Sequence, residues 1–192
     1  GDTLEALDAL IDGGGGSFPY EDLSSYYRRS SYGRLSISGD AFDYTALHAR
    51  SHYDDDVLAL FAEAMSALDA QIDYSDYDAN ADGYIDAVYL HFAGGDTGWM
   101  STWWSITQTW GDTGTEFDGV KPSKVVTLHL PSDDPFAAAT VIHETGHVLG
   151  LPDYYSASTQ TGGASWPSGI MGSDMMMDNV GDHNGFSKWL LG

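Results

Sequence analysis

Apolar side chains recur at helical spacing in three segments of the chain. The first two are residues 3–11 and 20–29, and the glycines at 13–16 between them predict a flexible joint. The third is residues 54–68, in which three aspartates at the start complement the helix macrodipole. One face of this third segment is apolar, at Val57, Leu58, Phe61, Met65 and Leu68. We therefore expect three helices, the third of which covers a sheet.

Alternation of apolar and polar residues indicates strands. Apolar residues alternate with small polar side chains in residues 32–38, and residues 84–92, 103–109 and 125–130 are further strand candidates. Tryptophans cluster around the 103–109 segment, and we interpret them first as core packing. Together the helices and strands predict an α/β (α+β) domain with a mixed twisted sheet.

The most specific pattern in the chain is HExxHxxGxxD, which begins at His143. On a helix, His143 and His147 share one face, so both imidazoles can point at one metal ion, with Glu144 beside them. Gly150 can adopt a left-handed conformation that ends the helix and turns the chain back. The returning segment presents Asp153, whose carboxylate is a suitable third ligand and leaves a fourth position open to water. The spacing therefore predicts a catalytic zinc site.

The residues around this pattern predict a buried helix, because apolar side chains surround the motif on most sides. Two imidazoles and a carboxylate are costly to bury unless a cation compensates for them. Zinc suits two nitrogen ligands and one oxygen ligand, although cobalt or manganese could occupy the same ligands in vitro. Glu144 would accept a proton from zinc-activated water and later pass it to a leaving amine. We therefore expect amide hydrolysis with Glu144 as the general base.

A second metal site is predicted in the acidic segment 78–86. Its spacing matches the start of a calcium loop, with a glycine at position 83 for the sharp turn. The expected ligands are oxygens of Asp78, Asn80, Asp82, Tyr84 and Asp86. The position where such a loop usually ends in glutamate is Tyr89, so a further ligand such as Asp76 would be needed. The alternative interpretation is an ordinary turn built on aspartate and asparagine side chains.

Composition limits the kinds of protein to which the chain can belong. Its 192 residues are 42% hydrophobic and 13% aromatic, enough for one well-buried domain, and it has no cysteine for disulfides or thiol catalysis. The formal net charge of -22 excludes nucleic-acid binding and disfavours anionic lipid, because both require basic residues. No apolar run is long enough for membrane insertion. The charge suits an extracellular monomer, and the start at Gly1 suggests a piece of a longer chain.

Five segments of the chain resemble one protein family, in the same order. They are YYRRSSYGRLSISG at 26–39, DYDANADGYIDAVYLHFAG at 76–94, HETGHVLGLPD at 143–153, SGIMGS at 168–173 and HNGFSKWLLG at 183–192. The family is the secreted bacterial metallopeptidases related to immune inhibitor A, which belong among the metzincin-like zinc peptidases. The resemblance implies a secreted zinc endopeptidase in which Glu144 is the general base and Met171 forms a turn beneath the metal. The zinc ligands that it implies are His143, His147 and Asp153.

The chain departs from the family pattern next to the predicted turn. Some relatives carry a tyrosine two residues after the methionine, where it assists the oxyanion, but this position is Ser173. Assistance must then come from elsewhere, and Tyr154 and Tyr155 are the candidates. His183 is a candidate for a group that supports the metal ligands or donates to the transition state. The other histidines lack ligand spacing and are interpreted as structural or exposed, at His48, His52, His91 and His129.

The predicted organisation is an N-terminal helix with a glycine-rich joint at 1–17 and a metallopeptidase domain at 18–192. We expect zinc as the catalytic cofactor, calcium as a structural ion, and a protein or peptide as the substrate. An edge strand at 103–109 would pair with the extended substrate in the metzincin-like arrangement. Two alternatives remain open: a calcium-stabilised binding or adhesion module with a vestigial zinc site, and a zinc amidase that acts on non-peptide amides.

Overall fold

The computed structural model combines α-helices with small β-sheets, which confirms the predicted mixture of the two. It describes residues 4–13, 21–95, 97–98, 101–111, 114–129, 137–155, 172–179 and 181–192. Contacts divide the chain into two compact units, the first formed essentially by Ala41–Leu130 and the second by Asp2–Asp40 with Pro131–Gly192. The domain boundary predicted after residue 17 lies outside the described residues and stays a prediction. Among the described helices, none has the length and apolar character needed to span a membrane.

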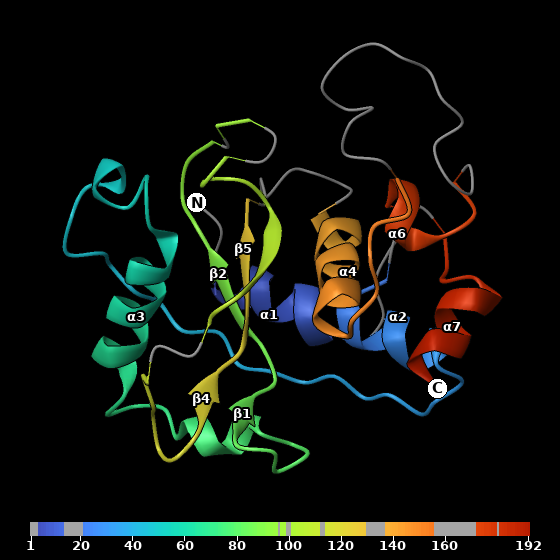
Figure 1. The fold of residues 1–192 in the computed structure, drawn as a ribbon, viewed down its shortest axis with the longest axis horizontal. Coiled ribbons are helices and arrows are strands. Elements are labelled where there is room, and N and C mark those ends of the chain that lie inside the picture. The colour runs from blue at the N-terminus through green and yellow to red at the C-terminus, as the bar shows by residue number, and fades with distance from the viewer. Residues whose placement is uncertain are drawn as a thin grey trace. The chain divides into compact units, whose positions relative to one another are not determined.

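The first unit contains two small sheets (Figure 1). In the larger sheet, β5 (Lys124–Leu128) is central: it pairs in parallel with β2 (Val88–His91) and antiparallel with β3 (Ile106–Thr109). The smaller sheet is a parallel pair of β1 (Tyr84–Ile85) and β4 (Lys121–Pro122). The larger sheet is therefore mixed, as predicted, and β3 lies at its edge.

Helix α3 (Val57–Leu68) supplies the apolar face predicted for residues 54–68. The helix begins after Asp56, because the Asp56 carboxylate accepts a hydrogen bond from the Ala59 N–H at 3.2 Å and so caps the first turn. Val57, Phe61 and Met65 are buried in one hydrophobic core with side chains of the strands. Phe61 meets the edge of Trp110 with ring centroids 6.1 Å apart. The core role of Trp110 is confirmed, and α3 contributes to the same core as residues of the strands.

The strand predicted at 84–92 is present but interrupted at Asp86. The Asp86 N–H donates to the Tyr77 carbonyl at 2.8 Å, and its carboxylate accepts from the Ala79 N–H at 3.3 Å. Tyr77 ends the 3₁₀ helix η2 (Tyr74–Tyr77), and a second short 3₁₀ helix, η1 (Arg50–His52), precedes α3. Because these bonds hold Asp86 to the preceding loop, the strand splits and its two halves pair with different partners, β4 and β5.

The second unit is helical in its described part. Its helices are α1 (Leu4–Asp12), α2 (Leu23–Ser30), α4 (Ala137–Val148), α6 (Met175–Asp178) and α7 (Gly185–Leu191). Helix α4 packs against α1, α2 and α6, and Figure 1 shows α4 beside α6. The helices predicted near residues 3–11 and 20–29 are thus confirmed as α1 and α2, and the Asp22 carboxylate caps α2 by accepting from the Ser25 N–H at 2.8 Å.

The strand predicted at residues 32–38 is wrong. Helix α2 ends in a tight turn in which Tyr32 and Gly33 have φ of 58° and 79°, and the Gly33 N–H donates to the Arg28 carbonyl at 2.7 Å. Leu35 and Ile37 are half-buried and alternate with exposed serines, as the pattern predicts. In the part of the chain that the structure describes, however, no strand pairs with this segment. A segment whose burial alternates but that has no neighbouring strand to share backbone hydrogen bonds with is extended chain and not a β-strand.

Candidate metal centre

Helix α4 places the first two predicted ligands in a buried environment. The apolar side chains of Val141 and Ile142 are 2% and 0% exposed, and His143 and Glu144 are 4% and 6% exposed. The prediction of a buried motif helix is therefore confirmed. Imidazoles and a carboxylate at this depth need partners that offset their lost hydration.

The end of α4 turns the chain toward the predicted third ligand. Gly150 has a φ of 101°, the left-handed conformation expected of it. The Gly150 N–H donates to the His147 carbonyl at 3.0 Å and the Leu151 N–H to the Gly146 carbonyl at 2.9 Å, which together form a Schellman cap. This cap ends the helix and directs the following segment, with Asp153, back along it.

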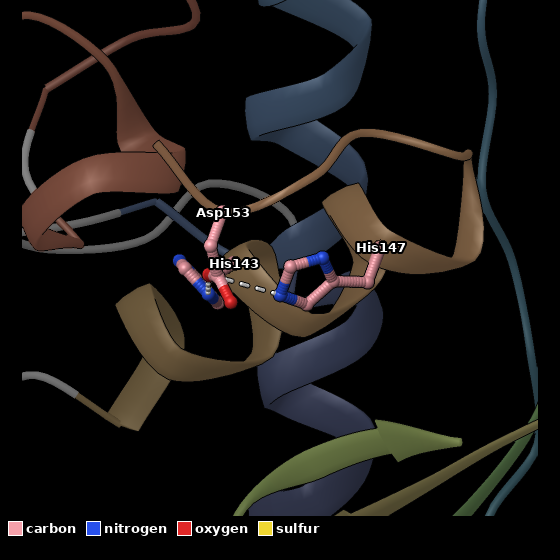
Figure 2. A group of neighbouring side chains, drawn as sticks. All are labelled: His143, His147 and Asp153. Carbon is pink, nitrogen blue, oxygen red and sulfur yellow. Dashed lines mark ion pairs between the residues drawn. The ribbon is translucent and has the colours of Figure 1, made fainter. Parts of the chain in front are cut away.

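The three predicted zinc ligands converge (Figure 2). Asp153 Oδ1 lies 3.2 Å from His143 Nε2 and 3.3 Å from His147 Nε2. Bonds of about 2.0–2.1 Å in a tetrahedral zinc site place neighbouring ligand atoms about 3.3–3.4 Å apart, so these separations fit zinc. Among the described residues, this is the only group of three or more His, Asp or Glu side chains whose ligand atoms lie within 4.8 Å of one another.

Backbone carbonyls orient both imidazoles. His143 Nδ1 lies 3.1 Å from the Met175 carbonyl oxygen, and His147 Nδ1 lies 2.8 Å from that of Leu151. A carbonyl only accepts, so each Nδ1 carries the proton, and in the neutral imidazole Nε2 is left as an acceptor. With both imidazoles neutral, their Nε2 atoms and the Asp153 oxygen are converging acceptor atoms. A metal ion or a proton between them offsets their mutual repulsion.

The pKa values of Asp153 and His147 show that positive charge is favoured at this site. Burial alone would raise the pKa of Asp153, but hydrogen bonds from His143 and His147 outweigh it and lower the pKa far below the usual 3.8. Burial alone would lower the pKa of His147, but its hydrogen bonds to Asp153 and the Leu151 carbonyl raise the pKa above 6.5. Without metal a proton takes the place of the cation, and a bound metal ion displaces it.

Glu144 and Tyr155 lie close to the ligands. The charge of Glu144 contributes to raising the pKa of both His147 and Tyr155, which places the carboxylate within electrostatic reach of each. The Tyr155 ring stacks on His143 at 6.4 Å with an 18° interplanar angle, and its hydroxyl is hydrogen-bonded to Asp153. Burial and the negative charge of Asp153 raise the Tyr155 pKa well above 10, so its phenol stays protonated as a donor.

The other candidates of the sequence analysis lie elsewhere. The Tyr154 hydroxyl is engaged with Ser187 Oγ at 2.9 Å, so of the two tyrosines Tyr155 is the one at the ligands. His183 is 3% exposed and contacts Asp174 and Tyr27, each at 3.3 Å, instead of a ligand. Met171 and the turn predicted around it lie outside the described residues.

Two carbonyls that orient the histidines were missed by the sequence analysis. The carbonyls of Met175 and Leu151 act through the backbone, which every residue type carries, so no side-chain pattern could have identified them. The methionine run at 175–177 belongs to α6, and Met175 and Met176 are fully buried.

The predicted calcium loop is compact and organised around its acidic side chains. Asp78 accepts hydrogen bonds from the backbone N–H groups of Asp82 at 3.0 Å and Gly83 at 2.8 Å. Asn80 and Asp82 accept from the N–H groups of Asp82 and Tyr84, each at 3.0 Å. These hydrogen bonds are expected both in a calcium loop and in a turn built on Asx side chains.

The remaining histidines do not join the ligand group. His48 and His52 are exposed, with ring centroids 4.1 Å apart, and His129 stacks on Phe92 at 5.6 Å. His91 lies half-buried in β2. The exposure of His48 and His52 agrees with their interpretation, and a structural role for His91 and His129 stays a prediction.

No protein-family model and no curated protein matches the sequence of this chain. The candidate centre is therefore defined by residues of this chain alone.

Proposed function

We propose that the chain is a zinc-dependent endopeptidase, secreted and related to the immune inhibitor A-like metallopeptidases, with a metzincin-like fold. The observation that carries the proposal is the convergence of three acceptor atoms on one point: Nε2 of His143, Nε2 of His147 and Oδ1 of Asp153. These atoms belong to a buried helix and its returning segment, where acceptors without a cation would be strongly unfavourable.

Zinc suits this set of two nitrogens and one carboxylate oxygen. When bound, it supplies a Lewis acid that polarises a carbonyl group and lowers the pKa of water. His143 and His147 would hold it through Nε2, because their Nδ1 atoms are engaged with carbonyls. Asp153 contributes the negative charge that makes the site favour a divalent cation over a proton.

Glu144 moves the proton in the proposed reaction. It neighbours His143 in the chain, is buried, and lies within electrostatic reach of His147. Its carboxylate takes a proton from the attacking water and delivers it to the leaving amine, so that one group acts first as base and then as acid.

Tyr155 provides the proposed assistance to the oxyanion. Its phenol is protonated and borders Asp153, so it can donate to a carbonyl oxygen that develops negative charge beside the ligands. Tyr155 is preferred because it lies beside His143 and Asp153, whereas Tyr154 contacts Ser187 and His183 contacts Tyr27 and Asp174.

Calcium is the second cofactor that we propose, held in the loop 78–86. The spacing of Asp78, Asn80 and Asp82 supports it, with the Tyr84 carbonyl and Asp86 as further ligands. The loop includes β1, so a bound ion would fix the position of that strand. The net charge of -22 also fits an extracellular monomer that acts on protein or peptide substrates.

Metal analysis combined with peptide cleavage tests the function. We expect about one zinc per chain, cleavage of an unbiased peptide library, loss of cleavage with chelator, and recovery when zinc is added back. Glu144→Gln keeps the zinc but lowers cleavage about 10²- to 10⁴-fold, because only the proton-transfer group is lost. Glu116→Gln, which changes an exposed glutamate of the first unit, is the matched control and leaves both unchanged.

The alternatives give different results in the same experiment. Cleavage of non-peptide amides without cleavage of peptides would identify an amidase. A chain that binds zinc but cleaves neither class, in wild type or Glu144→Gln, would be a binding module, and the endopeptidase proposal would be wrong.

A further inference from the structure

Asp174 is a buried carboxylate outside the proposed zinc site and is fully satisfied by donors. It is 0% exposed. It accepts hydrogen bonds from the Met176 N–H at 2.9 Å, the Asn184 N–H at 2.7 Å and the Ser187 hydroxyl at 2.5 Å. Its Oδ1 also lies 3.3 Å from His183 Nδ1. A buried charge with so many partners joins the elements that carry them, here α6, α7 and the segment between them.

The short helix α6, which Asp174 caps, contacts two of the three metal ligand segments through its carbonyls. The Met175 carbonyl lies 3.1 Å from His143 Nδ1. The next carbonyl, of Met176, accepts from the Tyr154 N–H at 3.0 Å, immediately after Asp153. A four-residue helix has little stability of its own, so the position of these carbonyls depends on its cap.

A second path leads from Asp174 to the same histidine. His183 bridges Asp174 and the Tyr27 hydroxyl, and this hydroxyl donates to the Ile142 carbonyl at 2.8 Å, one residue before His143. All of these side chains are at most 3% exposed. Hydrogen bonds to the carboxylate hold the pKa of Asp174 below 3.8 although its burial opposes this, so the group stays ionised.

We infer that Asp174 is a positioning residue for the metal centre: through α6 and the His183–Tyr27 path it fixes the Nδ1-protonated tautomer of His143 and the approach of Asp153. This inference rests on the zinc site of the proposed function. Asp174 touches no metal ligand itself and acts through the Met175 carbonyl. Groups that orient metal ligands in this way typically change metal affinity by about 10- to 100-fold when they are removed.

The test compares Asp174→Asn with wild type by zinc affinity and by imidazole ¹⁵N chemical shifts of the metal-free protein. The amide replaces one acceptor oxygen by a donor, which opposes the N–H and hydroxyl donors around it. We expect zinc to bind about 10- to 100-fold more weakly, and His143 to change from the Nδ1-protonated tautomer to a mixture. A shifted absorption spectrum of the cobalt-substituted protein would report the same distortion.

Controls separate positioning from a loss of stability. Asp56→Ala removes the side-chain cap of α3 in the other unit, so it lowers the melting temperature without changing zinc affinity or the His143 tautomer. Ser187→Ala removes one donor to Asp174 and is the milder variant if Asp174→Asn fails to fold; we expect about tenfold weaker zinc binding.

A folded Asp174→Asn or Ser187→Ala variant with wild-type zinc affinity and tautomer would overturn the inference. Its failure is distinct from that of the proposed function. If wild type cleaves no peptide or binds no zinc, the endopeptidase proposal fails, while the tautomer of His143 in the metal-free variants still decides whether Asp174 positions it.

Discussion

Gly146 offers the most direct test of the packing between α4 and α6. An added Cβ at this position would lie 2.3 Å from Met176 Sδ, 3.1 Å from Met176 Cε and 3.5 Å from the Tyr27 hydroxyl oxygen. Met176 is 0% exposed, so its thioether has no solvent-filled space into which to turn. Gly146→Ala therefore forces α6 and α4 apart.

The magnitude follows from two opposing effects. Non-bonded heavy atoms normally stay about 3.5 Å or more apart, so the 2.3 Å contact requires a shift of about 1 Å. Overpacking of this kind costs about 1–3 kcal/mol, and alanine returns about 1 kcal/mol through its higher helix propensity. With a contact this short we expect the upper part of the range, a net loss of about 2 kcal/mol. At about 2–4 °C per kcal/mol, the melting temperature falls by about 4–8 °C.

The assay is urea unfolding combined with zinc affinity in a double-mutant cycle with Met176→Ala. Met176→Ala alone costs about 2–5 kcal/mol because it leaves a cavity. In the double variant the new methyl group has room, so the loss of stability is smaller than the sum of the two single losses by at least about 1 kcal/mol. We also expect the zinc affinity lost in Gly146→Ala to return in part. Losses that add within about 0.5 kcal/mol, or a more stable Gly146→Ala, would refute the reasoning.

Three further predictions concern ions and pH. Chelation lowers the melting temperature, because free zinc at 100 times its Kd adds about 2.7 kcal/mol to the free energy of unfolding; an unchanged melting curve would argue against a zinc site. Burial lowers the pKa of His183 below 6.5 despite its contact with Asp174. The contribution of neutral His183 to the free energy of unfolding is therefore present above pH 6.5 and is lost as the pH falls below it. In urea unfolding, we expect acidification to lower the free energy of unfolding less in His183→Gln than in wild type. Calcium raises the melting temperature of wild type but not of Asp78→Ala, and the absence of a rise in wild type would favour the turn built on Asx side chains.

The sequence predicts best what local spacing determines. The ligand atoms of His143, His147 and Asp153 come from one short segment whose helical period and glycine cap bring them together, and the structure has both features. The apolar face of α3 is predicted for the same reason, because its period is contained within one helix.

Features that depend on distant partners were predicted less well. The alternation around Leu35 and Ile37 is real in burial, but a strand needs a neighbour that the local pattern does not specify. The strand expected at 84–92 splits at Asp86, because a bond to Tyr77 competes with the ladder. His183 was a candidate to support the metal ligands, but its partners Tyr27 and Asp174 could not be inferred from spacing.

The contrast between local spacing and distant partners also explains how the proposed centre can be sensitive to residues far from the motif. The HExxHxxGxxD segment supplies every ligand, but a neutral imidazole can protonate either nitrogen, and only one choice leaves Nε2 free for a metal. For His143 that choice is made by a carbonyl 32 residues away, on a four-residue helix held by Asp174. The motif can therefore remain intact while a substitution in α6 or its cap weakens the site. Zinc affinity, and not the presence of the ligands, is accordingly the quantity that reports whether the second unit is correctly packed.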